Sequence, residues 1–317
     1  MLSLGIREPM PASRTIFNDN GFIIIDKPEN MSSARVVARV KAALGAKKVG
    51  HTGTLDPFAT GVLVCCINRA TRLARFFLEG EKTYEATLRL GIETDTQDAT
   101  GAVISENRVA DFEKRRLADE FQRFQGWINQ IPPAYSALKH KGVPLYKLAR
   151  QGKPVEKPAR KVHISSIRIL EIEHPCIRFE VHCSAGTYVR TLCADIGKAL
   201  GCGGHLKTLN RTRSSGFFLE DALPLAELER LAGRGDLAPH VTSMNDALQS
   251  MPFVVAGSGL KAKVAHGITL TSEDVAPGET GNRGKYVKIV NRLHNLLAVV
   301  QRKKGSQNYD YCCVFQK

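Results

Sequence analysis

The hydrophobic pattern of the first part of the chain predicts two buried strands with a helix between them. Residues 21–25 (GFIII) form a short apolar run, and residues 61–67 (GVLVCCI) form an unbroken one that predicts a fully buried strand. Ser32 and Ser33 offer an N-cap for a helix that runs to about Leu44, with valines at positions 36, 37 and 40 on one side.

Further along the chain, predicted strands and helices are interspersed. Residues 83–90 alternate in polarity, which is typical of a strand with one solvent-facing side. Further strands are predicted near residues 162–173 and 177–183, and helices over 110–124, from 185–190 to about 200, and over 224–231. These elements predict a mixed α/β (α+β) fold with a largely antiparallel central sheet and helices packed against it.

From about residue 251 the pattern changes to short strand-like segments separated by Gly- and Asn-rich turns. The segments lie around residue 253 and over 286–290, 296–301 and 311–315. We therefore expect two domains, residues 1–250 and a small β domain of residues 251–317. The second holds ten basic residues against four acidic ones, a balance that predicts contact with RNA.

The segment from Ser136 to Lys161 is unusually basic, with eight basic residues and one acid, Glu156. Prolines and glycines punctuate it, so we expect a surface insertion over about residues 135–160. A solvated charged face is the plain alternative, but the lopsided charge favours an arm that contacts phosphates. Its basic residues include Lys139, Lys141, Lys147 and Arg150.

Composition agrees with a polyanionic partner. The 317 residues include 45 lysines and arginines against 31 acids, a net charge of +14, and phosphates reward dispersed positive charge by releasing counterions. A basic but otherwise ordinary cytosolic enzyme is the alternative. The eight cysteines include no C-x-x-C pair, which argues against a structural zinc site and for free thiols in a reducing compartment. No apolar run is long enough for a membrane span, so we expect a cytoplasmic protein with no membrane contact.

The turn at residues 50–57 (GHTGTLDP) concentrates residue types that carry chemistry. Its two glycines permit close approach of another backbone or a ligand. An aspartate before a proline usually only initiates a turn. Here Asp56 lies on a loop that leads directly into the buried strand of residues 61–67, so its carboxylate is presented from a rigid edge.

Five stretches in order make a specific resemblance. One resembles the catalytic motif of the TruB family of pseudouridine synthases and reads GHTGTLDPFATGVLVCCINRATRL. The other four resemble further segments of that family: NGFIIIDKPENMSS, KTYEATLRLGIETDTQDATG, IPPAYSALKHKGVPLYKLARQG, and SAGTYVRTLCADIGKALG with HLKTLNRTRSSGFF. Together they cover nearly all of residues 20–220. The tail resembles the family's β-barrel-like PUA-type RNA-binding domain more loosely. The resemblance implies a pseudouridine-synthase-like fold.

The resemblance also implies roles for residues of a base pocket. Asp56 matches the family's catalytic aspartate, and Arg190 matches the arginine paired with it. Tyr84 matches the tyrosine that packs on the target base and helps to remove its C5 proton. Tyr188 and Leu209 match residues that line the pocket.

Other matched positions support the site. His51 matches the histidine that packs against the RNA loop and helps to hold the target base out, and Lys27 with Pro28 matches a pair that supports the site from behind. The sequence departs from the common pattern at Thr54 and Phe58, where Ser and Leu are frequent, and neither change endangers the chemistry.

The reaction implied is the isomerisation of the T-loop uridine of tRNA, position 55, to pseudouridine. It breaks the N1 glycosidic bond, rotates the uracil and rejoins it through C5, so neither a cofactor nor a metal is needed. A carboxylate can attack the base, attack the sugar or remove a sugar proton, and the sequence leaves these open. The uracil must leave its stack, which costs a few kcal/mol and calls for an aromatic platform.

Three alternatives differ in class. A sister branch of the family works in guide-RNA particles, but the self-contained arm and compact tail favour a standalone enzyme with no obligatory protein partner. A non-catalytic RNA-binding module or tRNA folding chaperone is the second reading, and intact Asp56, Tyr84 and Arg190 argue against that as the only role. A metal-dependent hydrolase is the third, and no ligand cluster at metal spacing supports it.

Overall fold

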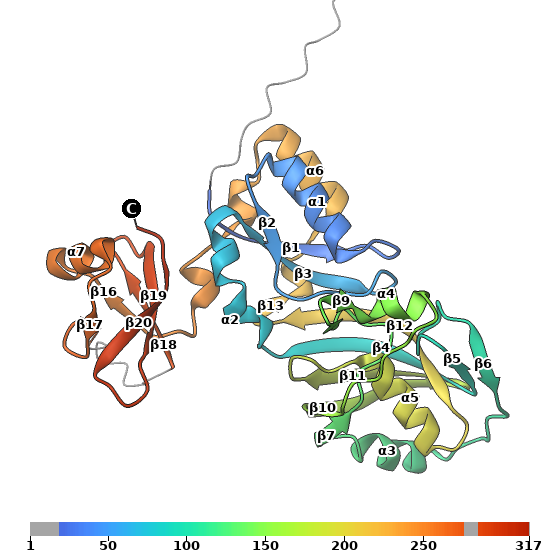
Figure 1. Ribbon diagram of the computed structural model, residues 1–317. Helices are drawn as coiled ribbons and strands as arrows, with labels where there is room; N and C mark the ends of the chain where they lie inside the picture. Colours follow the sequence, from blue (N-terminus) through green and yellow to red (C-terminus); the bar gives the residue numbers. More distant parts are fainter. Residues whose placement is uncertain (1–18, 276–284, 317) are drawn as a thin grey trace, which may run out of the picture.

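The computed structural model describes residues 19–275 and 285–316, and it consists of two sheets with helices packed on them (Figure 1). The helices and 3-10 turns are α1 (Ser33–Leu44), η1 (Asn68–Leu73), α2 (Arg75–Leu78), α3 (Lys114–Gln122), α4 (Leu145–Arg150), α5 (Val189–Ala199), η2 (Leu219–Asp221), α6 (Leu225–Arg234), η3 (Ala238–His240), η4 (Asp246–Leu248) and α7 (Ser258–His266).

The large sheet has the order β14-β1-β3-β12-β4-β11-β10-β7, with β2, β13 and β15 attached to it. Its strands are β1 (Gly21–Lys27), β2 (Val49–His51), β3 (Thr60–Ile67), β4 (Lys82–Leu90), β7 (Gly126–Gln130), β10 (Arg160–Glu173), β11 (Cys176–Cys183), β12 (Gly204–Ser214), β13 (Phe217–Phe218), β14 (Leu223–Pro224) and β15 (Thr242–Ser243). Among the described residues its parallel pairs are β1–β14 and β3–β12. The predicted mixed, largely antiparallel sheet is confirmed.

Two small hairpins lie outside this sheet. They are β5 (Ile92–Thr94) with β6 (Val103–Glu106), and β8 (Lys139–His140) with β9 (Val143–Pro144). The second hairpin belongs to the basic segment, which leaves the sheet after β7 and returns to it at β10. In the structure this segment contains a short hairpin followed by helix α4 (Leu145–Arg150).

Strands β1 and β3 are apolar on both faces because both faces are covered. On one face Ile25 and Leu63 belong to a core cluster with residues of α1 and α6. On the other, Phe22 and Val64 join a cluster that includes Val299 of the C-terminal sheet. The unbroken apolar run of β3 therefore reflects burial from two sides.

Strands β4, β10 and β11 are covered on one face only, which explains their alternating sequences. Their buried residues pack with helices α3 and α5 in a third core cluster, to which Phe121, Phe179 and Leu192 belong. The alternate positions, such as Thr83 and His182, form polar contacts on the opposite face.

The C-terminal sheet has the order β16-β18-β19-β20-β17, with helix α7 beside it (Figure 1). Its strands are β16 (Phe253–Val255), β17 (Leu270–Thr271), β18 (Tyr286–Val290), β19 (Leu296–Arg302) and β20 (Asn308–Val314). It contacts the segment around η1 and α2, where Arg72 Nη1 donates to Val314 O at 2.6 Å and the Arg69 and Arg72 guanidiniums lie 5.7 and 5.5 Å from the Phe315 ring centroid. The C-terminal sheet and the large sheet are therefore joined by a shared hydrophobic core and by polar contacts.

Several predicted bounds need correction. The helix expected over 110–124 covers only Lys114–Gln122, because the residues before it are irregular. The helix expected to open at 185–190 begins at Val189, because Ala185 and Gly186 form a turn. The helix expected over 224–231 runs from Leu225 to Arg234. The central strand β12 and helix α7 were not predicted.

Candidate active site

The loop that carries Asp56 is fixed from behind by two buried side chains. Ser33 Oγ accepts from the Leu55 N–H and donates to the Leu55 carbonyl, both at 2.9 Å. Lys27 Nζ donates to the carbonyls of Pro28, Met31 and Pro57 at 2.7, 2.6 and 3.0 Å. The residues on either side of Asp56 are therefore held, and the supporting position predicted for Lys27 and Pro28 matches this geometry.

Arg190 meets Asp56 at the start of helix α5. Its Nε lies 2.9 Å from Asp56 Oδ2, while Nη1 donates to Thr96 O at 3.0 Å and Nη2 to Tyr135 O at 2.8 Å. The Arg190 side chain is only 4% exposed, whereas that of Asp56 is 36% exposed. The two terminal nitrogens of the guanidinium are thus held by backbone carbonyls, and the carboxylate is partly exposed.

Asp98 is a second carboxylate at this arginine, and the sequence did not single it out. Its Oδ2 lies 3.6 Å from Arg190 Nε, and its Oδ1 accepts from the Thr100 N–H and hydroxyl at 2.9 and 2.6 Å and from the Thr96 hydroxyl at 2.8 Å. Asp98 is buried. It places a fixed negative charge behind Arg190.

Tyr84 and Leu209 lie on the two central strands β4 and β12. Leu209 is buried in the core cluster against which Tyr84 packs, and it lines a cavity of about 280 Å³. Arg211 pairs with Tyr84 across the strands and is 2% exposed, donating from Nε to Val62 O at 2.7 Å and from Nη2 to Gly53 O at 3.1 Å. Arg211 was also missed, although its place two residues after Leu209 puts both side chains on one face of the strand.

Tyr188 is held through its backbone and its ring. The buried Gln130 side chain accepts from the Tyr188 N–H at 2.7 Å and donates to the Tyr188 carbonyl at 3.0 Å. The Arg160 guanidinium lies 4.8 Å from the centre of the Tyr188 ring and donates to Gly186 O. Nothing in the sequence pattern pointed to Gln130, because its partner lies far along the chain.

His51 ends strand β2 at the entrance to the Asp56 loop. Its Nδ1 accepts from the Gly53 N–H at 3.2 Å. Burial, together with the nearby Arg211 charge, lowers the pKa of His51. The ring is therefore a largely neutral, partly exposed surface beside the loop.

Burial shapes the titration of the remaining groups. It raises the pKa of Asp56 above its usual range, and Arg190 opposes this effect only in part. It also raises the pKa of the Tyr84 hydroxyl, against the effect of Arg211. Burial lowers the pKa of Lys27 to about 8, although Asp56 favours the ammonium. Because a third of the Asp56 side chain is exposed, solvent moderates the shift there.

The predicted RNA-contacting residues all lie on the surface of the basic segment. Lys139 and Lys141 belong to the β8–β9 hairpin, and Lys147 and Arg150 to helix α4, and all four side chains are exposed. The root of this segment includes Tyr135, whose carbonyl accepts from Arg190. The segment is therefore joined directly to the Asp56 site.

Comparison with known proteins decides the family. The pattern of the TruB family pseudouridylate synthase N-terminal domain matches residues 41–189, and that of the tRNA pseudouridylate synthase B C-terminal domain matches residues 190–249. The chain belongs to the TruB family. The tRNA pseudouridine synthase B of Syntrophotalea carbinolica is 43% identical over 272 residues, covering 86% of this chain and 88% of that protein. The enzyme of that name from Geobacter sulfurreducens is 45% identical over 262 residues, covering 82% and 85%.

A solved structure extends the likeness over most of the chain. The structure titled as a Cbf5-Nop10-Gar1 complex superposes with a TM-score of 0.73 at 29% identity, covering 93% of this chain and 85% of that one. The predicted pseudouridine-synthase fold and enzyme class are confirmed.

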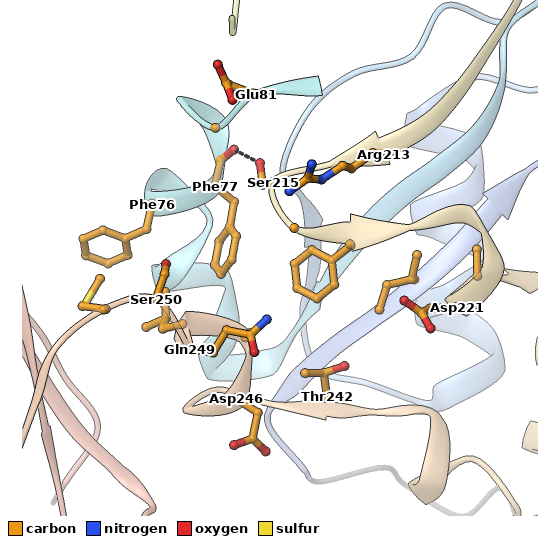
Figure 2. Close-up of a pocket in the computed structure, with 18 of the residues that line it drawn as sticks. Phe76, Phe77, Glu81, Arg213, Ser215, Asp221, Thr242, Asp246, Gln249 and Ser250 are labelled. Atoms are coloured by element: carbon orange, nitrogen blue, oxygen red, sulfur yellow. Dashed lines mark hydrogen bonds between the residues drawn. The ribbon is translucent and has the colours of Figure 1, made fainter. Parts of the chain in front are cut away.

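A larger cleft lies at the seam of the two sheets, away from Asp56. It measures about 1180 Å³, and none of the residues predicted for the site lines it. Figure 2 shows part of its lining, which includes Phe76, Phe77, Gln249 and Asp246, and in which Ser215 donates to the Phe77 carbonyl. In this TruB protein the Asp56 site and the seam cleft are thus separate features.

Three further observations concern ligands and compartments. In residues 19–275 and 285–316 no group of three or more His, Cys, Asp or Glu side chains is arranged to hold a metal ion. No helix in that part of the chain is long and apolar enough to cross a membrane. All eight cysteines are free thiols.

Proposed function

We propose that this protein isomerises uridine 55 in the T-loop of tRNA to pseudouridine, with Asp56 as the essential carboxylate. The proposal rests on the Asp56–Arg190 pair, because it joins a partly exposed carboxylate to a buried guanidinium whose two terminal nitrogens are held by backbone carbonyls. Membership of the TruB family and the names of its relatives agree with it.

The pocket residues take roles that follow from their placement. The target base leaves the RNA stack and lies against Tyr84, with Tyr188 and Leu209 as further walls, and His51 keeps the loop from closing again. The C1′–N1 bond breaks, the uracil turns, the C1′–C5 bond forms, and the C5 proton moves off while N1 gains one. Asp56 supplies the carboxylate that each route to this exchange requires, and Tyr84 helps to remove the C5 proton.

Ionised Asp56 is the form that acts. Enclosure by protein raises its pKa, and the adjacent guanidinium favours the charged carboxylate. Arg190 therefore keeps Asp56 reactive towards neutral pH, and the Lys27 and Ser33 contacts hold the loop in register with it. No cofactor enters this chemistry, since the reaction only exchanges two bonds of one substrate.

The RNA is gripped by the basic segment and the tail. The exposed Lys139, Lys141, Lys147 and Arg150 are placed to contact phosphates of the T stem-loop. We assign residues 1–250 to a catalytic domain with this insertion and residues 251–317 to a PUA-like RNA-binding domain. The protein acts in the cytoplasm on tRNA, without an obligatory protein partner.

The test is an assay with a uridine-containing T stem-loop transcript and no added cofactor. The proposal expects pseudouridine at the target position and nowhere else in the loop. A protein that binds the transcript tightly yet forms no pseudouridine would instead be an RNA-binding module or tRNA chaperone.

A further inference from the structure

Strand β7, at the edge of the large sheet, exposes the chain's single tryptophan. Trp127 is 70% exposed, the largest aromatic side chain left in solvent among the described residues. Burying an aromatic side chain of this size is worth about 1.5–3 kcal/mol, so its exposure calls for an account. A single exposed apolar residue is common on protein surfaces, so the side chains around Trp127 decide whether it has a role.

The residues around Trp127 form a partly aromatic surface with polar neighbours, which we call the platform. Trp127 pairs with His163 of β10, and the ring centres lie 4.9 Å apart at 45°. The next pair on this face, two residues along, is Asn129 with Lys161, and both side chains are exposed. The platform thus presents an indole, an imidazole, an amide and an ammonium group side by side.

The platform is rigid. The His163 backbone forms two hydrogen bonds with Ser184. Its N–H donates to Ser184 Oγ at 2.9 Å, and its carbonyl accepts from the Ser184 N–H at 2.8 Å. The His163 ring nitrogen Nδ1 lies 3.4 Å from Ser165 Oγ. The imidazole therefore backs the indole from a fixed position and leaves the outer indole face free.

The charges of this face favour an anionic ligand. Lys161 is the last member of the basic segment already proposed to contact phosphates, so the platform continues that surface. Two carboxylates near this face already have partners: Glu81 lies 3.1 Å from Ser165 and 2.9 Å from His182, and Glu180 lies 3.3 Å from Arg168. The ammonium of Lys161 has no ion-pair partner among the described residues.

We propose that the Trp127–His163–Lys161 platform binds an unpaired nucleotide of the RNA substrate, outside the stem-loop that enters the Asp56 site. The base stacks on Trp127, its phosphate contacts Lys161, and Asn129 reaches the base edge. The platform faces away from the core side of the sheet, on which Ile128 and Val162 lie. RNA reaches it round β7, the last strand at this edge (Figure 1).

The same strand connects the platform to the pocket. Gln130, three residues after Trp127, holds the backbone of Tyr188. Three residues of strand span about 10 Å, so RNA bound at the Asp56 site passes close to the platform. This inference rests on the proposed function, because it names a second contact for the same RNA.

The single tryptophan makes the test direct, since the protein's indole emission reports on Trp127 alone. Wild-type protein is titrated with a full-length tRNA transcript and with the isolated T stem-loop. Full-length tRNA is expected to quench the emission by stacking, and the stem-loop is expected to leave it nearly unchanged. Saturating full-length tRNA without any quenching would overturn the proposal.

Variants separate the platform from general RNA binding. Trp127→Thr is expected to weaken full-length tRNA binding by roughly 5- to 150-fold, the range of one stacked base, and Trp127→Phe to recover most of it. Turnover of the isolated stem-loop should remain within about twofold, which keeps this test apart from that of the proposed function. The matched control is Ile104→Thr, which removes another exposed apolar side chain of a strand.

Two outcomes would contradict the proposal. Equal tRNA affinity of Trp127→Thr and Ile104→Thr would mean that no base stacks on the indole. An emission that shifts with protein concentration in the absence of RNA, together with dimers in sedimentation, would assign the platform and its strand edge to a second copy of the chain.

Discussion

Arg190 Nε lies 2.9 Å from Asp56 Oδ2 and 3.6 Å from Asp98 Oδ2, so one buried guanidinium stands between two carboxylates. The other nitrogens of Arg190 are taken by the carbonyls of Thr96 and Tyr135. The arginine therefore links the Asp56 loop, the Thr-rich turn and the root of the basic segment. Its replacement should affect both the charge of Asp56 and the geometry around it.

Replacing Arg190 with Met should shift the acid limb of the activity profile to higher pH. Burial raises the pKa of Asp56 and Arg190 opposes that effect, so removing the cation leaves burial unopposed and more acid remains protonated at a given pH. The plateau rate should also fall by about 10²–10³-fold. Single-turnover rates against pH measure both effects, because product release does not enter them.

Arg190→Lys is the matched control. It restores a charge but not the planar two-pronged contacts, so it should recover the pH profile better than the rate. If Arg190→Met lowers the rate equally at every pH, Arg190 positions RNA or the fold and has no effect on the ionisation of Asp56.

Replacing Asp98 with Asn should move the acid limb in the opposite direction. The Asp98 carboxylate raises the pKa of Asp56, so its neutralisation favours ionised Asp56 and shifts the limb to lower pH. The plateau should fall by about tenfold, or about 1.4 kcal/mol, because Arg190 loses one of its anchors. An acid limb that moves to higher pH would show that Asp98 acts only by holding Arg190.

Deprotonation of Lys27 should limit activity on the alkaline side. Burial lowers the pKa of Lys27 to about 8, and the neutral amine has only two N–H groups for the three carbonyls that it holds. The unfolded lysine keeps a pKa near 10.5, so between pH 8 and that value the unfolded chain binds more protons and the contribution of Lys27 to stability rises with pH. Single-turnover rates should therefore fall above about pH 8 while the melting temperature does not fall with them. Parallel losses of rate and melting temperature would point to unfolding instead.

Replacing Lys139, Lys141 and Lys147 with Gln should weaken RNA binding and flatten its salt dependence. Each lost phosphate contact lowers the slope of log affinity against log salt by about 0.7–0.9. The three side chains are exposed, so the fold should be unaffected, which circular dichroism checks. An unchanged salt slope would make the segment a solvated surface without an RNA contact.

The secondary-structure elements that could be predicted are those whose local sequence pattern fits only one type of element. Strands β1 and β3 could be predicted because Phe22, Ile23, Val62 and Leu63 leave no face for solvent, and helix α1 because Ser32 caps it, accepting from the Arg35 N–H at 3.2 Å. Strand β12 could not, because its exposed Lys207 and Thr208 break the apolar pattern at the point where the strand has a bulge.

The site was predicted at the positions where chemistry is concentrated in one motif, and missed where it depends on distant partners. Asp56 and its partner Arg190 come from two recognisable stretches, and the structure brings them within 2.9 Å. Asp98 and Gln130 become part of the site only in the folded chain, where they contact Arg190 and Tyr188. Such contacts between distant segments leave no local periodicity or spacing to read.

The C-terminal part of the chain shares a hydrophobic core with the large sheet. Val299 and Phe315 of the C-terminal part pack in one cluster with Phe22 and Val64 of the large sheet. Removing the tail would expose this apolar face, so its contribution to RNA affinity is better measured with surface substitutions than by truncation.

The most direct test compares wild type with Asp56→Asn on one T stem-loop transcript, measuring single-turnover pseudouridine formation alongside RNA affinity. The substitution keeps the shape of the side chain and removes its charge. The Asp56→Asn variant should bind the RNA about as tightly as wild type and form no pseudouridine. A rate within about tenfold of wild type, a loss of no more than about 1.4 kcal/mol in transition-state stabilisation, would exclude Asp56 as the essential carboxylate.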